Sequence, residues 1–113
     1  MKGQSISSVK LLDAVIATGA GPRHTPKGAT NRTFQATGTT SAGAGAATIK
    51  VQVSNVETPT VDGDWIDLAT LSLTLGVTQT TSGTNSDQAW RHVRGNVTAI
   101  SGTDATVTLW MGA

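Results

Sequence analysis

The chain has 113 residues, enough for one domain, and its eight basic and seven acidic residues leave a formal net charge of +1, which argues against a broad nucleic-acid-binding face. Thr, Ala, Gly and Ser (20, 14, 13 and 9 residues) make up half of the chain, and charged residues only 13%, against about 25% in a typical domain; this excludes a helical bundle or a coiled coil. The absence of Cys excludes disulfides and thiolate metal sites. The first residues show no apolar core of a signal peptide, and no apolar run approaches the roughly 18 residues of a membrane-spanning helix, so neither feature is predicted.

The N-terminal part of the chain is the least regular. Residues 5–17 contain apolar positions that fit either a bulged strand or a short helix, and their β-branched and Ser residues favour the strand. Residues 20–31 carry two of the three prolines, which predicts an exposed, extended loop. We therefore expect residues 1–30 to form an N-terminal arm and loop, followed by a core sandwich over residues 31–112.

Alternation of apolar and polar side chains predicts most of the strands. Four segments alternate cleanly and two more weakly; they are residues 47–53, 71–77, 93–99 and 105–111, and residues 33–39 and 65–68. This pattern indicates an all-β chain that forms a single antiparallel β-sandwich or a jelly-roll-like domain.

Small polar residues predict the connections between these strands. The stretches 39–45 (TTSAGAG) and 80–86 (TTSGTNS) are interpreted as loops. A turn around Gly102 separates the last two strands, so residues 90–111 are predicted to form an antiparallel hairpin with Val97 and Val107 on its inward face.

The sequence offers little for catalysis. His24 and His92 are the only histidines, and both are expected at the surface, His92 because it alternates with an apolar neighbour. Asp62 and Asp64 flank a glycine, which predicts a turn held by side-chain hydrogen bonds, with a calcium loop as the weaker alternative. We expect no enzymatic activity, no metal and no cofactor.

Tryptophans and arginines are the residue types that protein interfaces favour. Trp65 and Trp90 are expected to cover the ends of the core, whereas the parity of the last strand turns Trp110 outward. The candidate interface residues are Arg23, His24, Lys27, Arg32, Arg91, Arg94 and Trp110.

Three stretches together resemble small structural proteins of tailed-bacteriophage virions. They are AATIKVQVSN, DGDWIDLATLSLT and AWRHVRGNVTAISGTDATVTLWM, and the resemblance covers roughly residues 30–112. It implies a small β-sandwich that coats or joins parts of a virion, most often as a capsid decoration (cement) protein, and it brings no catalytic residues. The segment VETPTV at 56–61 departs from the Gly- and Asp-rich turn expected there from that pattern. This departure affects the expected geometry of the loop and not the class of the fold.

The expected function is thus that of a non-enzymatic virion protein, assembled in the host cytoplasm and placed on the capsid exterior. Its expected partners are the major capsid protein or other virion proteins and further copies of itself, with a trimer as the first choice of homo-oligomer. Two alternatives remain open: a neck or tail component, and a carbohydrate-binding module that uses exposed tryptophans and the Asp62–Asp64 loop.

Overall fold

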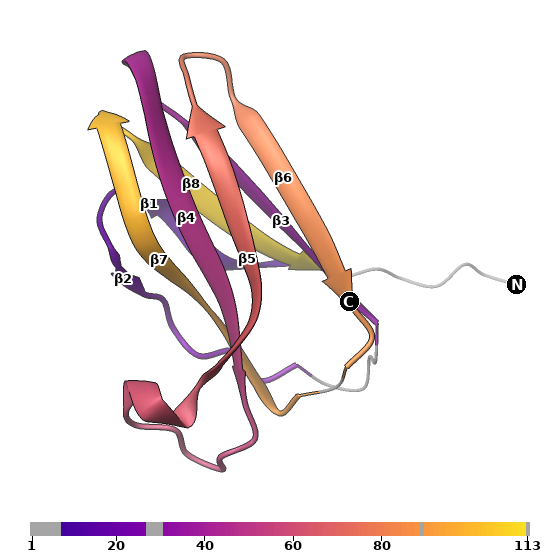
Figure 1. Ribbon diagram of the computed structural model, residues 1–113. Coiled ribbons are helices and arrows are strands. Elements are labelled where there is room, and N and C mark those ends of the chain that lie inside the picture. Colours follow the sequence, from indigo (N-terminus) through magenta and orange to yellow (C-terminus); the bar gives the residue numbers. More distant parts are fainter. Residues whose placement is uncertain (1–7, 27–30, 89, 113) are drawn as a thin grey trace, which may run out of the picture.

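The computed structural model describes residues 8–26, 31–88 and 90–112 and consists almost entirely of strands (Figure 1). The strands are β1 (Ser8–Val15), β2 (Gly19–Ala20), β3 (Arg32–Thr39), β4 (Ala42–Ser54), β5 (Ile66–Leu75), β6 (Thr80–Ser86), β7 (His92–Thr103) and β8 (Thr106–Gly112). A single turn of 3-10 helix, η1 (Asp62–Asp64), interrupts the connection between β4 and β5.

The strands form two antiparallel four-stranded sheets packed face to face, which confirms the all-β sandwich. Sheet 1 has the order β1-β8-β3-β6 and sheet 2 the order β2-β7-β4-β5. Strand β1 pairs with β8, β2 with β7, β3 with β6 and β4 with β5. The chain is therefore one long hairpin, folded back at the β4–β5 connection and rolled into two sheets, which is the topology of a jelly roll.

The predicted hairpin over residues 90–111 is wrong, because β7 and β8 belong to different sheets (Figure 1). The turn at Gly102 (φ 120°) and Asp104 (φ 50°) carries the chain from one sheet to the other. Val97 and Val107 are nevertheless both buried, at 1% exposure each, because they enter the same core from its two sides. Alternation identified the inward face of each strand but not its partner.

The strand favoured for residues 5–17 is confirmed over residues 8–15, and this part of the chain therefore belongs to the sandwich and not to a separate N-terminal arm. Residues 8–15 form β1, paired with β8, and Leu11 and Leu12 are both buried. A register shift between Lys10 and Leu12 lets two consecutive leucines face the core, as a bulge does. The sandwich therefore begins at residue 8 rather than at 31, while the first seven residues of the expected arm lie outside the described residues.

The segment after β1 stays close to sheet 2. Gly19–Ala20 forms β2 against β7, and the backbone of His24 exchanges hydrogen bonds with that of Val93, at 2.8 Å each. The proline-containing stretch is thus an extended segment along the edge of β7, up to residue 26.

Both segments predicted as loops from small residues contribute to strands. Residues 80–86 form β6 along the whole of β3, and β4 already begins at Ala42. The inward positions of β6 hold Thr80, Ser82 and Thr84, so this edge strand lacks the apolar alternation that would have identified it. Threonine and serine can occupy strand positions, so a prediction of loops from small polar residues alone missed these parts of β4 and β6.

The core is filled from both sheets at the alternating positions, and two glycines allow the sheets to pack closely. A Cβ at Gly95 would lie 2.7 Å from Leu12 Cγ, and one at Gly38 would lie 2.7 Å from Leu75 Cδ2. In β7 a register shift near Thr98 reverses the pattern: Ala99, predicted to face inward, is exposed, and Ile100 packs on the core.

Candidate functional site

Most of the candidate interface residues gather at one end of the sandwich, the lower end in Figure 1, where the β2–β3, β4–β5 and β6–β7 connections meet. We call it the three-loop end. Arg23 and His24 belong to the first connection, Arg91 to the third, and Arg32 and Arg94 lie near the starts of β3 and β7. Lys27 lies outside the described residues, and Trp110 lies on the outer face of sheet 1.

The side chain of Arg94 contacts other residues of the same chain. Its Nε donates to Gln52 Oε1 at 2.8 Å and its Nη2 to Asp62 Oδ1 at 3.1 Å. Its guanidinium also lies 4.5 Å from the centroid of the Trp65 ring. Only 11% of the Arg94 side chain is exposed. This arginine therefore fastens the β4–β5 connection onto sheet 2 and is not a free interface residue, contrary to the prediction.

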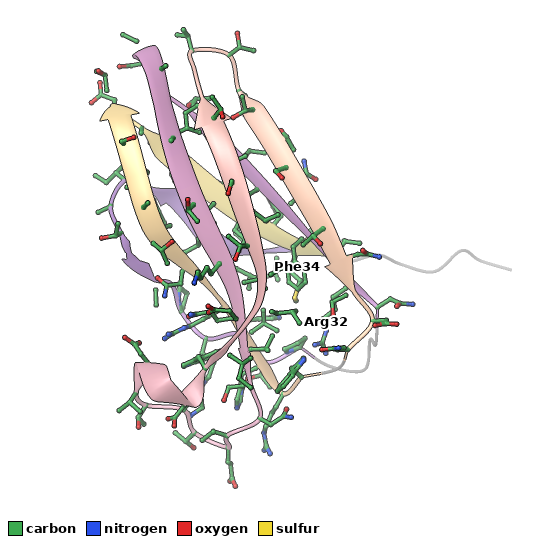
Figure 2. All side chains as sticks on the ribbon, viewed as in Figure 1. Arg32 and Phe34 are labelled. Carbon is green, nitrogen blue, oxygen red and sulfur yellow. The ribbon has the colours of Figure 1, made fainter. Side chains whose placement is uncertain are left out.

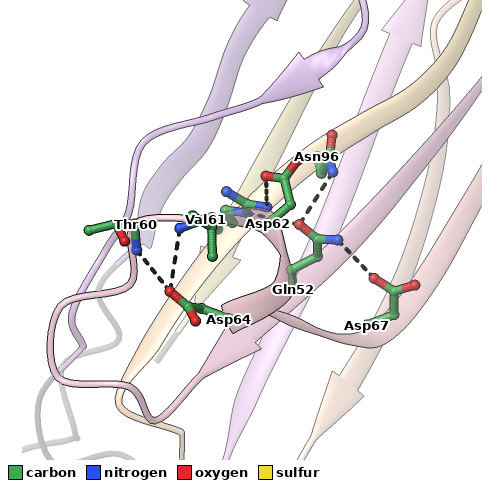
Figure 3. A network of polar contacts seen from close by, with 8 residues as sticks. Gln52, Thr60, Val61, Asp62, Asp64, Asp67 and Asn96 are labelled. Carbon is green, nitrogen blue, oxygen red and sulfur yellow. Dashed lines mark hydrogen bonds and ion pairs between the residues drawn. The ribbon is translucent and has the colours of Figure 1, made fainter.

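The same network continues across the outer face of sheet 2. Gln52 donates through Nε2 to Asp67 Oδ1 at 2.8 Å and accepts from Asn96 at 3.3 Å (Figure 3). Lys50 Nζ lies 2.8 Å from Asp67 Oδ2. The hydrogen bond from Lys50, followed by the one from Gln52, holds the pKa of Asp67 below its ordinary value. The ionised carboxylate is thus the form that the fold favours.

Acidification should remove this contribution. Because the pKa of Asp67 is lowered in the folded chain, its stabilising effect is present above the pKa of the unfolded chain and is lost as the pH falls through the folded pKa. We expect Asp67→Asn to lower Tm near neutral pH by a few degrees at most, because the pair is partly exposed to solvent, and we expect this difference to vanish as the pH falls through the lowered pKa of Asp67. Thermal unfolding of both chains across pH measures this, and a difference that does not depend on pH would contradict it.

Asp64 holds the turn before β5, as predicted. Its Oδ2 accepts from the backbone N–H groups of Thr60 at 3.0 Å and Val61 at 3.3 Å (Figure 3). Asp62 turns instead toward Arg94. Within the described ranges, no group of three or more His, Asp or Glu side chains is arranged to hold a metal ion.

His92 is buried, at 4% exposure, and not at the surface as predicted. Its Nε2 lies 3.0 Å from the carbonyl oxygen of Glu57 and its Nδ1 lies 2.8 Å from Thr25 Oγ1. Since a carbonyl can only accept, Nε2 carries a proton, and the ring links the β2–β3 and β4–β5 connections to β7. The imidazole is a structural link between three segments, and both of its nitrogens are already engaged.

Arg32, a member of the candidate interface set, is buried to the same extent as His92, at 4% exposure. It occupies an inward position of β3, and its Nη1 donates to the carbonyl oxygen of Trp90 at 3.2 Å. Burial lowers its pKa. The prediction that Arg32 is exposed at an interface is therefore wrong, whereas Arg23 and Arg91 do present exposed side chains at the three-loop end.

Trp110 faces outward, as its parity predicted, and is half-buried. Lys10 Nζ lies 4.9 Å from the centroid of its ring, and Gln35 is its cross-strand neighbour on β3. The rest of this outer face is uncharged along β3, β6 and β8; its side chains are Thr33, Gln35, Thr37, Thr39, Thr81, Asn85, Thr106 and Thr108. We call this surface, with Trp110, the threonine face.

The other two tryptophans differ in their surroundings. Trp90 packs on the core and donates to Gln88 Oε1 at 3.2 Å, in agreement with its predicted covering role. Trp65 lies beneath the guanidinium of Arg94 on the outer side of sheet 2, rather than closing the core.

Three surface hollows of about 280 to 330 Å³ lie on the described part of the chain. The titratable side chains that line them are Asp104 in one and Asp87 in another, so none of the three brings an acid and a base together. No helix among the described residues is long and apolar enough to cross a membrane. Comparisons with protein-family models, with curated proteins and with solved structures found no match for this chain.

Proposed function

We propose that the protein is a non-enzymatic structural subunit of a tailed-bacteriophage virion, which binds the outside of the head shell as a decoration protein. The observation that carries this proposal is the threonine face: an uncharged sheet surface over β3, β6 and β8 with a half-buried tryptophan on β8, at its side next to β1. The jelly roll by itself does not assign a function, because this fold serves many. The resemblance of residues 30–112 to virion proteins supports the choice of a virion partner.

The threonine face has the composition of a docking surface. Interfaces enrich aromatic residues and are depleted in Lys, Glu and Asp, and on this face the charged side chains come from β1 alone, where Lys10 and Asp13 pair at 3.3 Å. Strands β3, β6 and β8 supply a regular array of short side chains on which a second flat surface can pack. The indole of Trp110 is the one large side chain that such a partner could cover.

Assembly also fits the modest core of this chain. Net stability is a small remainder after the entropy cost of folding, and a partner that binds only the folded form adds to it by mass action. We include a homo-oligomer, with a trimer as the first choice, because the same face could meet neighbouring copies. Arg23 and Arg91 would then lie at the rim, where their charges remain hydrated.

The carbohydrate alternative relies on a tryptophan beside the Asp62–Asp64 loop, and the one that lies there, Trp65, has the guanidinium of Arg94 4.5 Å from its ring centroid. Arg94 is itself held by Gln52 and Asp62, so this face of Trp65 is occupied within the chain. This observation favours the structural proposal over the sugar-binding alternative.

Removing the indole tests the proposal. Trp110→Ala should leave the isolated subunit folded, because the side chain points away from the core, but should weaken oligomerisation or attachment to purified heads by about 30-fold, as loss of an aromatic hot spot of about 2 kcal/mol does. Circular dichroism, gel filtration and co-sedimentation with heads and with separated tails measure these effects. Thr70→Ala, at an exposed position of β5 in the other sheet, is the control and should leave assembly unchanged.

Binding of the wild type to separated tails, and not to heads, would replace the decoration role by the neck or tail alternative. An unfolded Trp110→Ala subunit, or one that assembles with unchanged affinity, would contradict the role of the threonine face.

A further inference from the structure

Arg32 is the least satisfied charged group in the described part of the chain. Its Nη1 donates to Trp90, but its Nε is buried without any hydrogen-bond partner, and no ion pair involves it. The residues outside the described ranges contain no Asp or Glu that could supply a side-chain carboxylate. Arg32 thus has no side-chain counter-ion, and a buried cation in this state is destabilising unless a partner compensates its charge.

The lining of one surface hollow includes neighbours of Arg32 but not Arg32 itself. Figure 2 shows Arg32 and Phe34 directed into the space between the two sheets, in agreement with their burial. Ser86, the residue paired with Arg32, and Phe34 both line a hollow of about 280 Å³ between β5 and β6. The remaining lining residues are Leu68, Ala69, Thr84, Asn85, Asp87 and Gln88.

We propose that Arg32 binds a carboxylate presented by a second polypeptide chain, which enters through this hollow. The bond from Nη1 to Trp90 fixes the guanidinium plane, and the buried Nε–H group is left without an acceptor. A carboxylate oxygen is a strong acceptor for such an N–H group, and arginine is the residue best suited to pair with carboxylates. This proposal concerns the buried side chain at the start of β3. It depends neither on the threonine face nor on the assignment to a virion.

The size and lining of the hollow favour a peptide over a free small molecule. Its volume lies at or below the lower limit of small-molecule pockets, which leaves room for one side chain or one terminal residue. Phe34, Leu68 and Ala69 offer an apolar wall, and Asn85 and Gln88 offer amides that can bond to a peptide backbone. The carboxylate is the common group, and it can come from an Asp side chain or from a C-terminal residue.

Thermal unfolding of the full chain tests this. The probes are sodium acetate, which mimics the side chain, and N-acetylalanine, which mimics a terminal residue, each titrated at constant ionic strength against sodium chloride, with acetamide as the neutral control. We expect a saturable rise in the Tm of the wild type with one or both carboxylates and none with acetamide. The probe with the lower half-saturation concentration identifies the source.

Two substitutions at Arg32 separate recognition from packing. Arg32→Met should raise the Tm of the isolated chain by about 4 °C or more, since it removes an uncompensated buried charge, and should abolish the response to carboxylates. Arg32→Lys keeps the charge but lacks the Nε–H group of the guanidinium, so it should weaken the response at least tenfold. Arg91→Met, at an exposed arginine of the same end, should change neither.

Asp87 provides the internal competitor, because it lines the same hollow. If the partner comes from outside, Asp87→Asn should leave the Tm without added carboxylate unchanged or higher, because it removes only a negative charge near the path of the partner. A fall in that Tm which acetate restores would show that Asp87 itself pairs with Arg32 in solution, and would overturn the proposal. Equal Tm shifts with acetate, acetamide and chloride, or a destabilised Arg32→Met chain, would overturn it as well.

Discussion

Val107→Asp should unfold the protein. Val107 is 1% exposed, lies on β8 in the middle of sheet 1, and pairs with Val15 and Gly38 on its two neighbours. An unpaired carboxylate at this depth costs several kcal/mol, which is comparable to the whole net stability of about 5–15 kcal/mol expected for a domain. Far-ultraviolet circular dichroism and urea denaturation should show a chain without a cooperative transition.

The neighbouring residue provides the control. Thr106 lies next to Val107 in space and sequence but faces outward and is half-buried, so Thr106→Asp should leave the fold intact and shift the urea midpoint only slightly. Because the two variants carry the same new charge one residue apart, only the direction of the side chain differs. Tolerance of Asp at both positions would contradict the inward assignment of β8.

Gly95→Ala should be the most damaging single-methyl substitution that we consider. The new Cβ would lie 2.7 Å from Leu12 Cγ and 2.8 Å from Leu109 Cδ2, both in the packed core between the sheets. Overpacking of this kind forces side chains from their preferred rotamers and typically costs about 1–3 kcal/mol. The free energy of unfolding, extrapolated from urea denaturation, measures the loss.

The same substitution at Gly63 is the matched control. Nothing lies within 4 Å of a Cβ built there, and its backbone is not in the left-handed region. Gly63→Ala should therefore be neutral or stabilising by up to about 1 kcal/mol, since it reduces the freedom of the unfolded chain. If both alanines had the same effect, close packing of the sheets at Gly95 would not explain the need for glycine there.

The candidate site was predicted in its membership but not in its roles. The sequence singled out Arg23, His24, Arg32, Arg91 and Arg94, and the fold brings these residues to the three-loop end. Their charge and type suggested exposure, yet Arg32 is buried and Arg94 is almost so. Whether an arginine is free depends on which loop covers it, and that loop can come from any part of the chain.

His92 shows the same limit. Alternation with Val93 correctly placed it on the outer side of sheet 2, but the connections that carry Thr25 and Glu57 cover that side and bury the ring. These residues lie 67 and 35 positions away from His92, beyond the reach of any local pattern. The Gln52 network was missed for this reason too, since its members come from β4, β5, β7 and η1.

The sequence by itself determined the class of the fold and the inward face of most strands. Side chains in a strand alternate by geometry, so Ile49, Leu73 and Val107 identify a buried face without knowledge of any partner. Only the tertiary structure decided that β7 pairs with β4 rather than β8, that β6 exists, and that Arg32 lies in the interior. Which strands pair, and which residues a loop covers, depends on how much apolar surface the whole folded chain buries. This depends on contacts between distant segments, so the periodic pattern of one short segment cannot predict it.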